Sequence, residues 1–123
     1  MSRYKNQRFR ARLGFALRGL AQALRSEASL RLQALAFAAA LLVLFALRPP
    51  AVWWALVILA SAAVVAAELF NTAIEHLADL LHPQQSPGIR LVKDCAAAGV
   101  LVAVLGALGV AAALLVHLLS GAL

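Results

Sequence analysis

Three long runs without a charged residue divide the chain, at 32–47, 51–67 and 95–119. A helix needs about 20 apolar residues to cross about 30 Å of hydrocarbon. The third run is long enough alone, and the first reaches that length when 28–30 are added. The second run ends at a carboxylate, Glu68, but apolar residues continue at helical spacing beyond it. The pattern therefore predicts three membrane-spanning helices, at about 28–47, 51–80 and 90–119.

The segment before these spans has a different pattern. From 5 to 25, apolar residues recur three and four positions apart with arginines between them. This spacing predicts a helix with one apolar and one basic face, which lies in the membrane interface. The spans are separated by Pro49-Pro50, which cannot continue a helix, and by the polar stretch 82–88. The sequence thus predicts an all-α membrane protein that forms one domain over 1–123.

Composition and charge agree with this reading. The chain is 64% hydrophobic and 13% charged, which is too little polar surface for a water-exposed globule. Eight of its eleven basic residues lie in the first 31 positions, next to apolar spans. Such a segment is typical of the cytoplasmic side of a membrane with anionic lipid, and does not indicate nucleic-acid binding. Three spans then place Arg90 and Lys93 on the same, cytoplasmic side as the N-terminus.

The five acidic residues hold the most functional information. Each charge at membrane depth costs roughly 2.5–3.5 kcal/mol, so such residues are functional candidates. At 100° per residue, one stripe about 100° wide along the second span collects five polar side chains: Glu68, Asn71, Thr72, Glu75 and Asp79. Repulsion among three carboxylates predicts a positive partner. That partner is either a basic side chain, Lys93 or Arg90, or Mg²⁺, which prefers carboxylate and phosphate oxygens.

The remaining acids are predicted to lie at the same interface. Glu27 and Arg31 stand at the entry to the first span, and Lys93 and Asp94 at the entry to the third. Acids, a cation and cytoplasmic access suit phosphoryl transfer, whose catalysis is mostly positioning and charge neutralisation. Two structural interpretations stay open. Glu27 and Arg31 have the spacing of an ordinary surface pair on a helix, and Lys93 is placed to snorkel from a helix end.

Other features favour structural roles. The chain has one cysteine, Cys95, so it forms no internal disulfide. The three histidines are scattered along the chain and are interpreted as structural: His76, His82 and His117. Small residues recur every four positions in the third span and predict close helix packing: Gly99, Ala103, Ala107 and Ala111. The sequence contains no phosphate-binding glycine loop of the usual kinds, so a nucleotide site would be of another type.

Two motifs together carry a family resemblance. The segment 68–79, ELFNTAIEHLAD, and the later Lys93-Asp94 pair resemble the signature of the bacterial integral-membrane diacylglycerol kinases, a family that includes the undecaprenol kinases. The basic N-terminal segment, Arg18-Gly19 and Glu27 fit the same family, so the resemblance covers nearly the whole chain. It implies a homotrimer in the bacterial inner membrane, with sites shared between subunits. It also implies transfer of the γ-phosphoryl group of MgATP to a lipid hydroxyl.

The resemblance further implies a role for each polar residue. Glu68 would be the general base that takes the proton from the lipid hydroxyl. Glu27 and Glu75 would bind ATP through the metal ions that bridge its phosphates. The nucleotide site would also contain three residues nearer the helix ends: Asp79, Lys93 and Asp94. Two further residues would position these groups and the substrate: Asn71 and Arg31.

These motifs indicate the reaction more clearly than they indicate which lipid accepts the phosphoryl group. Diacylglycerol, giving phosphatidic acid, is the expected acceptor, and undecaprenol is the alternative. The alanines at 96–98 and the Glu75-His76 pair favour the undecaprenol branch, and Gln33 stands near where the enterobacterial kinases are expected to carry an acid. Two rivals from other classes are a small pore or holin-like protein and a small multidrug transporter. A pore has no use for five converging acids. Small multidrug transporters usually need four spans and lack the Lys93-Asp94 opening of the third span.

Overall fold

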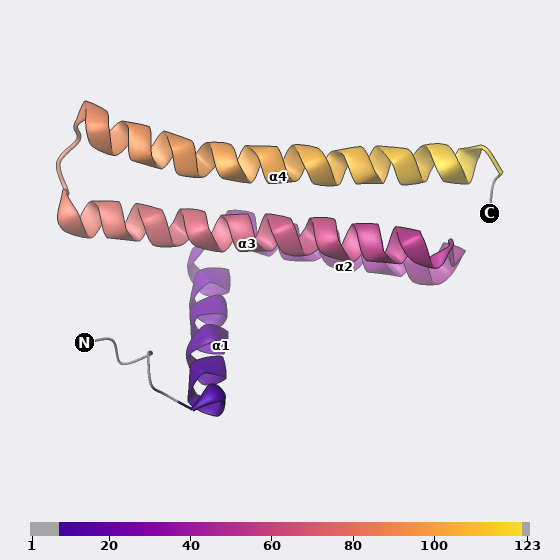
Figure 1. Ribbon diagram of the computed structural model, residues 1–123, viewed down its shortest axis with the longest axis horizontal. Coiled ribbons are helices and arrows are strands. Elements are labelled where there is room, and N and C mark those ends of the chain that lie inside the picture. Colours follow the sequence, from indigo (N-terminus) through magenta and orange to yellow (C-terminus); the bar gives the residue numbers. More distant parts are fainter. Residues whose placement is uncertain (1–7, 122–123) are drawn as a thin grey trace.

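Residues 8–121 are described by a computed structural model, and they fold into four helices (Figure 1). In chain order the helices are α1 (Phe9–Ser26), α2 (Ala28–Leu47), α3 (Ala51–Leu81) and α4 (Pro87–Leu119). No strand occurs among these residues. By length and composition, α2, α3 and α4 can each cross a membrane. The predicted all-α architecture with three spans is therefore confirmed, while the predicted residues 5–7 of the first helix lie outside the described part.

Local sequence accounts for the breaks between the spans. α2 ends at Arg48, whose backbone is left-handed with φ 47°, and Pro49-Pro50 prevent the helix from continuing. α4 begins three residues before the predicted position, because Ser86 caps it. The Ser86 hydroxyl accepts a hydrogen bond from the backbone N–H of Ile89 at 3.2 Å, and Pro87 follows in the first helical position. A serine cap followed by proline is a strong helix start.

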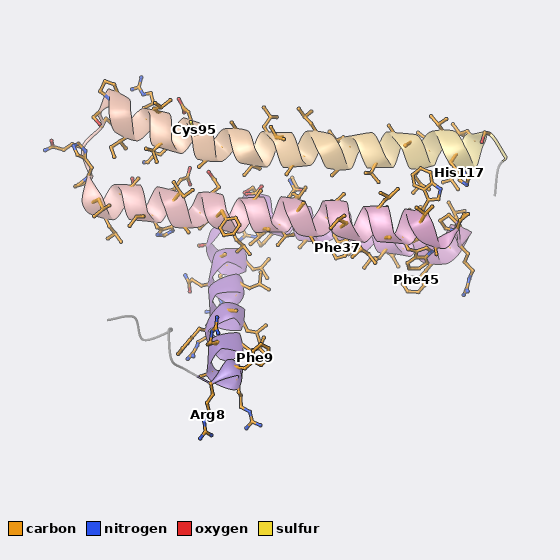
Figure 2. The ribbon with its side chains drawn as sticks, viewed as in Figure 1. Arg8, Phe9, Phe37, Phe45, Cys95 and His117 are labelled. Atoms are coloured by element: carbon orange, nitrogen blue, oxygen red, sulfur yellow. The ribbon has the colours of Figure 1, made fainter. Side chains whose placement is uncertain are left out.

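The three spans run along a common direction, and α1 crosses it (Figure 1). α3 contacts both α2 and α4, and α1 contacts α2 and α3. A buried cluster of Leu44, Val57 and Leu114 joins the spans near the end where the C-terminus lies. Phe45 and His117 lie at that same end (Figure 2), where their rings contact Trp54 and Trp53 at centroid distances of 4.8 and 5.3 Å. Aromatic packing thus fixes the end of the bundle that is far from α1.

Most of the surface of the spans is apolar and uncovered within the single chain. In the most apolar stretch of α4, 6% of the residues are buried. Large side chains such as Leu42, Leu59 and Val102 are exposed. This surface is suited to hydrocarbon, because lipid tails solvate leucine as well as a protein core does. The described part of the chain therefore has the surface of a membrane protein.

α1 meets the bundle before the end where α3 turns into α4, so the last turns of α3 and the first turns of α4 project past it (Figure 1). Glu75 and Asp79 lie on the last turns of α3, and Lys93 and Asp94 on the first turns of α4. Most of the acids therefore gather at the same end of the molecule as the basic helix α1.

Candidate active site

Glu68 is the buried acid of the span α3. Its exposed fraction is 5%, and it is the one polar residue buried among the described residues. The hydroxyl of Ser29, in the first turn of α2, donates a hydrogen bond to Oε2 of Glu68 at 3.0 Å. A buried carboxylate is strongly destabilising without such a donor. Ser29 therefore ties Glu68 to the neighbouring span.

Asn71 lies one turn beyond Glu68 on the predicted polar stripe. Its side-chain oxygen, Oδ1, is buried and has no hydrogen-bond partner among the described residues. Glu75 follows one turn later and is partly buried. Buried oxygens are normally hydrogen-bonded, so this oxygen is available to a donor or a cation from outside residues 8–121. The stripe thus presents an unsatisfied oxygen beside a carboxylate.

Asp79 stands near the end of the stripe, paired with Lys93. Lys93 Nζ donates to Asp79 Oδ1 at 2.6 Å, which links α3 to α4. The Asp79 side chain is 62% exposed and that of Lys93 is 26% exposed. Lys93 thus supplies the positive partner that the sequence predicted for the acids, at Asp79. A pair this exposed contributes less than about 1 kcal/mol to stability, so folding alone gives little reason for it.

Glu27 occupies the corner between α1 and α2. Its backbone is extended, with φ −114° and ψ 110°, so that α1 and α2 are separate helices. Arg31 stabilises this corner, because its Nη1 donates to the carbonyl oxygens of Leu24 at 2.9 Å and Arg25 at 2.8 Å. Glu27 and Arg31 therefore do not share a helix face as an ordinary surface pair. Arg31 caps the end of α1 and fixes where Glu27 lies.

Asp94 lies in the exposed first turns of α4. Together with Arg90, Gln85 and Ser86 it lines a hollow of about 390 Å³ at the loop between α3 and α4. The hollow is at the same end of α3 and α4 as the Lys93–Asp79 pair. The structure thus places Asp94 next to this pair in the chain but does not join it to the acids of α3.

An apolar groove of about 370 Å³ starts one turn deeper in the bundle than the Ser29–Glu68 bond. α2, α3 and α4 all contribute to it. Gln33 and Val64, one turn from Ser29 and Glu68 respectively, line the end nearest to that bond. Ala107 and Ala111 of the predicted small-residue face also line the groove. A side chain added at Gly99 would meet nothing within 4 Å, so within this chain that residue is not a point of close helix approach.

The predicted site residues fall at two levels along α3. Glu68 and Ser29 form the deeper level, and Asp79 and Lys93 form the outer one, about 16 Å away along the helix axis by the α-helical rise. Among residues 8–121, no three His, Cys, Asp or Glu side chains come together as a metal-binding group. Ser29 was not among the predicted site residues. Its signal was a hydroxyl in the first turn of an apolar helix, in a chain with an intramembrane acid that lacked a partner.

His82 and His117 lie near opposite ends of the bundle, and Cys95 directly follows Asp94 on α4. His82 Nδ1 contacts the carbonyl oxygen of Gln84 at 2.7 Å within the loop, and His117 contacts Trp53 at the opposite end of the bundle. Cys95 is exposed on α4 (Figure 2). The structural roles of the three histidines stay a prediction, and His76 directly follows Glu75 on α3.

Comparison with known proteins identifies the family. The profile described as prokaryotic diacylglycerol kinase matches residues 14–115. The chain belongs to the prokaryotic diacylglycerol kinase family. It is also 33% identical to the undecaprenol kinase of Bacillus subtilis (strain 168) over 85 residues, which is 69% of each chain. Members of this family are membrane lipid kinases, so the chain is a kinase with ATP and a lipid as substrates. The pore and transporter alternatives are therefore set aside.

Proposed function

We propose that this kinase transfers the γ-phosphoryl group of ATP to the hydroxyl of diacylglycerol, in a Mg²⁺-dependent reaction that gives phosphatidic acid. The observation that carries the proposal is the buried carboxylate of Glu68 at the head of an apolar groove. A lipid chain in this groove would bring its hydroxyl to Glu68. A carboxylate within hydrogen-bond reach of a hydroxyl can act as its general base.

In the proposed reaction, Glu68 takes the proton of the lipid hydroxyl as its oxygen attacks the γ-phosphorus. The new O–P bond forms while the bond between the γ-phosphorus and the bridging oxygen breaks, and ADP leaves with that oxygen. Oε2 of Glu68 accepts from Ser29, and we propose that the other oxygen, Oε1, receives the proton. Lys93 would contact the phosphates, with Asp79 and Asp94 supporting the nucleotide nearer the helix ends.

The donor set suits a magnesium ion. Glu27 and Glu75 are carboxylates, and Asn71 carries a buried oxygen without a partner. Mg²⁺ prefers one or two carboxylates together with phosphate oxygens. We propose that Glu27 and Glu75 hold the ion and that Asn71 helps to position it. When bound, the ion would neutralise charge on the phosphates, as in other phosphoryl-transfer enzymes.

Undecaprenol is the second candidate acceptor. The relative from Bacillus subtilis is named an undecaprenol kinase. The alanines at 96–98 and the Glu75-His76 pair point the same way. Both acceptors are membrane alcohols with long apolar chains, so the chemistry at Glu68 is the same for either.

The test is phosphate transfer by the purified protein in mixed micelles with labelled MgATP. Diacylglycerol, undecaprenol and monoacylglycerol are compared as acceptors at equal mole fractions. Faster labelling of diacylglycerol supports the first proposal, and faster labelling of undecaprenol supports the second. Absence of transfer to all three lipids would reject both.

We also propose a homotrimer in the bacterial inner membrane, with the N-terminus in the cytoplasm. The uncovered apolar surface of the spans and the basic residues of α1 support this arrangement. α1 has no acidic residue in its first turn and carries arginines along its length, as a helix at an anionic leaflet would.

Lys93 provides a separate test of the nucleotide site. Lys93→Gln is expected to raise the KM for MgATP about 10- to 100-fold, because it removes a charged hydrogen bond to phosphate. Stability should change by less than about 1 kcal/mol, since the Lys93–Asp79 pair is exposed. Arg90→Gln removes a charge three residues earlier and serves as the control, with less than about threefold change. A normal KM together with a large loss of stability would show that Lys93 is purely structural.

A further inference from the structure

The hydrogen bond between Ser29 and Glu68 spans two helices. Ser29 is on α2 and Glu68 on α3, and the donor and acceptor atoms are 3.0 Å apart. Glu68 is buried, whereas Ser29 is exposed at residue level. The bond therefore joins a buried carboxylate on one helix to an exposed serine on the other.

A serine in a helix ordinarily bonds to a carbonyl of its own preceding turn. Ser29 lacks that turn, because the helix is broken at Glu27. The carbonyl of Arg25, four residues earlier, accepts from Arg31 Nη1 at 2.8 Å instead. Because the usual backbone acceptor is taken by Arg31, the Ser29 hydroxyl is left to donate to Glu68 on α3.

This bond occupies one oxygen of the carboxylate and leaves the other for chemistry. Within residues 8–121, no second hydrogen bond to Glu68 is present besides that of Ser29. A glutamate side chain in an apolar helix has several rotamers, and one fixed oxygen removes most of that freedom. A general base must hold a lone pair toward the hydroxyl that it deprotonates.

We propose that Ser29 is a positioning residue, which fixes Glu68 so that Oε1 faces the lipid hydroxyl at the head of the groove. The inference rests on the proposed role of Glu68 as the base. Ser29 itself exchanges no proton with the substrate. Its contribution is to set the orientation of the carboxylate, so its loss lowers turnover and leaves nucleotide binding unchanged.

The experiment compares Ser29→Ala and Ser29→Thr in the wild-type and Glu68→Gln backgrounds, using the full-length protein in mixed micelles. Ser29→Ala is expected to lower kcat about 10- to 100-fold, the range for loss of a hydrogen bond to a charged group, with the KM for MgATP unchanged. Ser29→Thr keeps the hydroxyl and should remain within about threefold of wild type. In the Glu68→Gln background, Ser29→Ala should change kcat by less than about twofold.

Three controls separate positioning from folding. Ser26→Ala removes a hydroxyl at the same corner and should leave kcat unchanged. Thermal unfolding of each variant in detergent shows whether the bundle is intact. Should Ser29→Ala fail to fold, Ser29→Cys takes its place, since a thiol has nearly the same shape and is a weak donor. It should also lower kcat, by less than Ser29→Ala, because the thiol still donates weakly.

Two outcomes would overturn the inference. One is a wild-type kcat in a folded Ser29→Ala or Ser29→Cys variant. The other is an equal fractional loss with and without the Glu68 carboxylate, which would show that Ser29 acts elsewhere. Other results would show that the proposed function itself is wrong. These are normal turnover in the Glu68→Gln variant, or no lipid phosphorylation by the wild-type protein.

Discussion

Glu68→Gln is expected to lower turnover 10²- to 10⁴-fold, the range for removal of a general base. The amide has nearly the shape of the carboxylate, and its oxygen can still accept the hydrogen bond from Ser29. Its nitrogen cannot take a proton from the lipid hydroxyl. The substitution therefore removes the general base and keeps the packing of α2 against α3. The measurement is the initial rate of lipid phosphorylation at saturating MgATP and lipid.

Two further measurements make this result specific. The thermal unfolding midpoint in detergent should stay close to that of the wild-type protein, because no buried hydrogen bond is lost. The KM for MgATP should also be retained, because Glu68 is proposed to contact the lipid hydroxyl and not to bind the phosphates. Turnover near the wild-type value would show that Glu68 is not the base. Its burial would then have only a packing role.

The helices of this protein were predictable because the membrane constrains their length. A span needs about 20 apolar residues, and the uncharged runs with their proline breaks mark three such helices. The polar stripe on α3 was predictable for a similar reason, since helical periodicity alone places Glu68, Asn71 and Glu75 on one face. Features that depend on a single helix were thus accessible from the sequence.

Features that depend on how two helices pack together could not be predicted from the sequence. Periodicity fixes which residues share a face but not how far α2 is rotated or shifted against α3. The Ser29–Glu68 bond depends on that register. The sequence likewise offered both Lys93 and Arg90 as partners for the acids, and the packing of α4 on α3 selects Lys93 for Asp79.

The role of Arg31 shows the same limit. Its spacing from Glu27 left an ordinary helical pair open as one interpretation, but one extended residue at Glu27 ends that periodicity. Arg31 then reaches back to the carbonyls of Leu24 and Arg25, which are free because they end α1. Because of this break in the helix, Arg31 caps the end of α1 and does not pair with Glu27 along a helix face. The break also placed Glu27 at the junction of α1 and α2.

Glu75→Ala is expected to raise the Mg²⁺ concentration for half-maximal activity by at least about tenfold. Loss of a residue that supports a metal site typically weakens metal binding 10- to 100-fold, and a direct carboxylate ligand should fall within or above that range. Glu75 is one turn from the unpartnered oxygen of Asn71, which is the reason that the ion is proposed to lie at this part of α3. The measurement is a Mg²⁺ titration of activity at fixed ATP, with free metal controlled.

The neighbouring residue supplies the matched control. His76 is exposed and lies off the polar stripe, so His76→Ala should leave the Mg²⁺ titration unchanged. Excess Mg²⁺ should restore part of the activity of Glu75→Ala, because the remaining ligands and the ATP phosphates still bind the ion. Restoration at high metal distinguishes a metal ligand from a residue needed for folding, whose loss added magnesium does not repair. A wild-type titration curve for Glu75→Ala would remove Glu75 from the metal site and leave Glu27 as its proposed carboxylate.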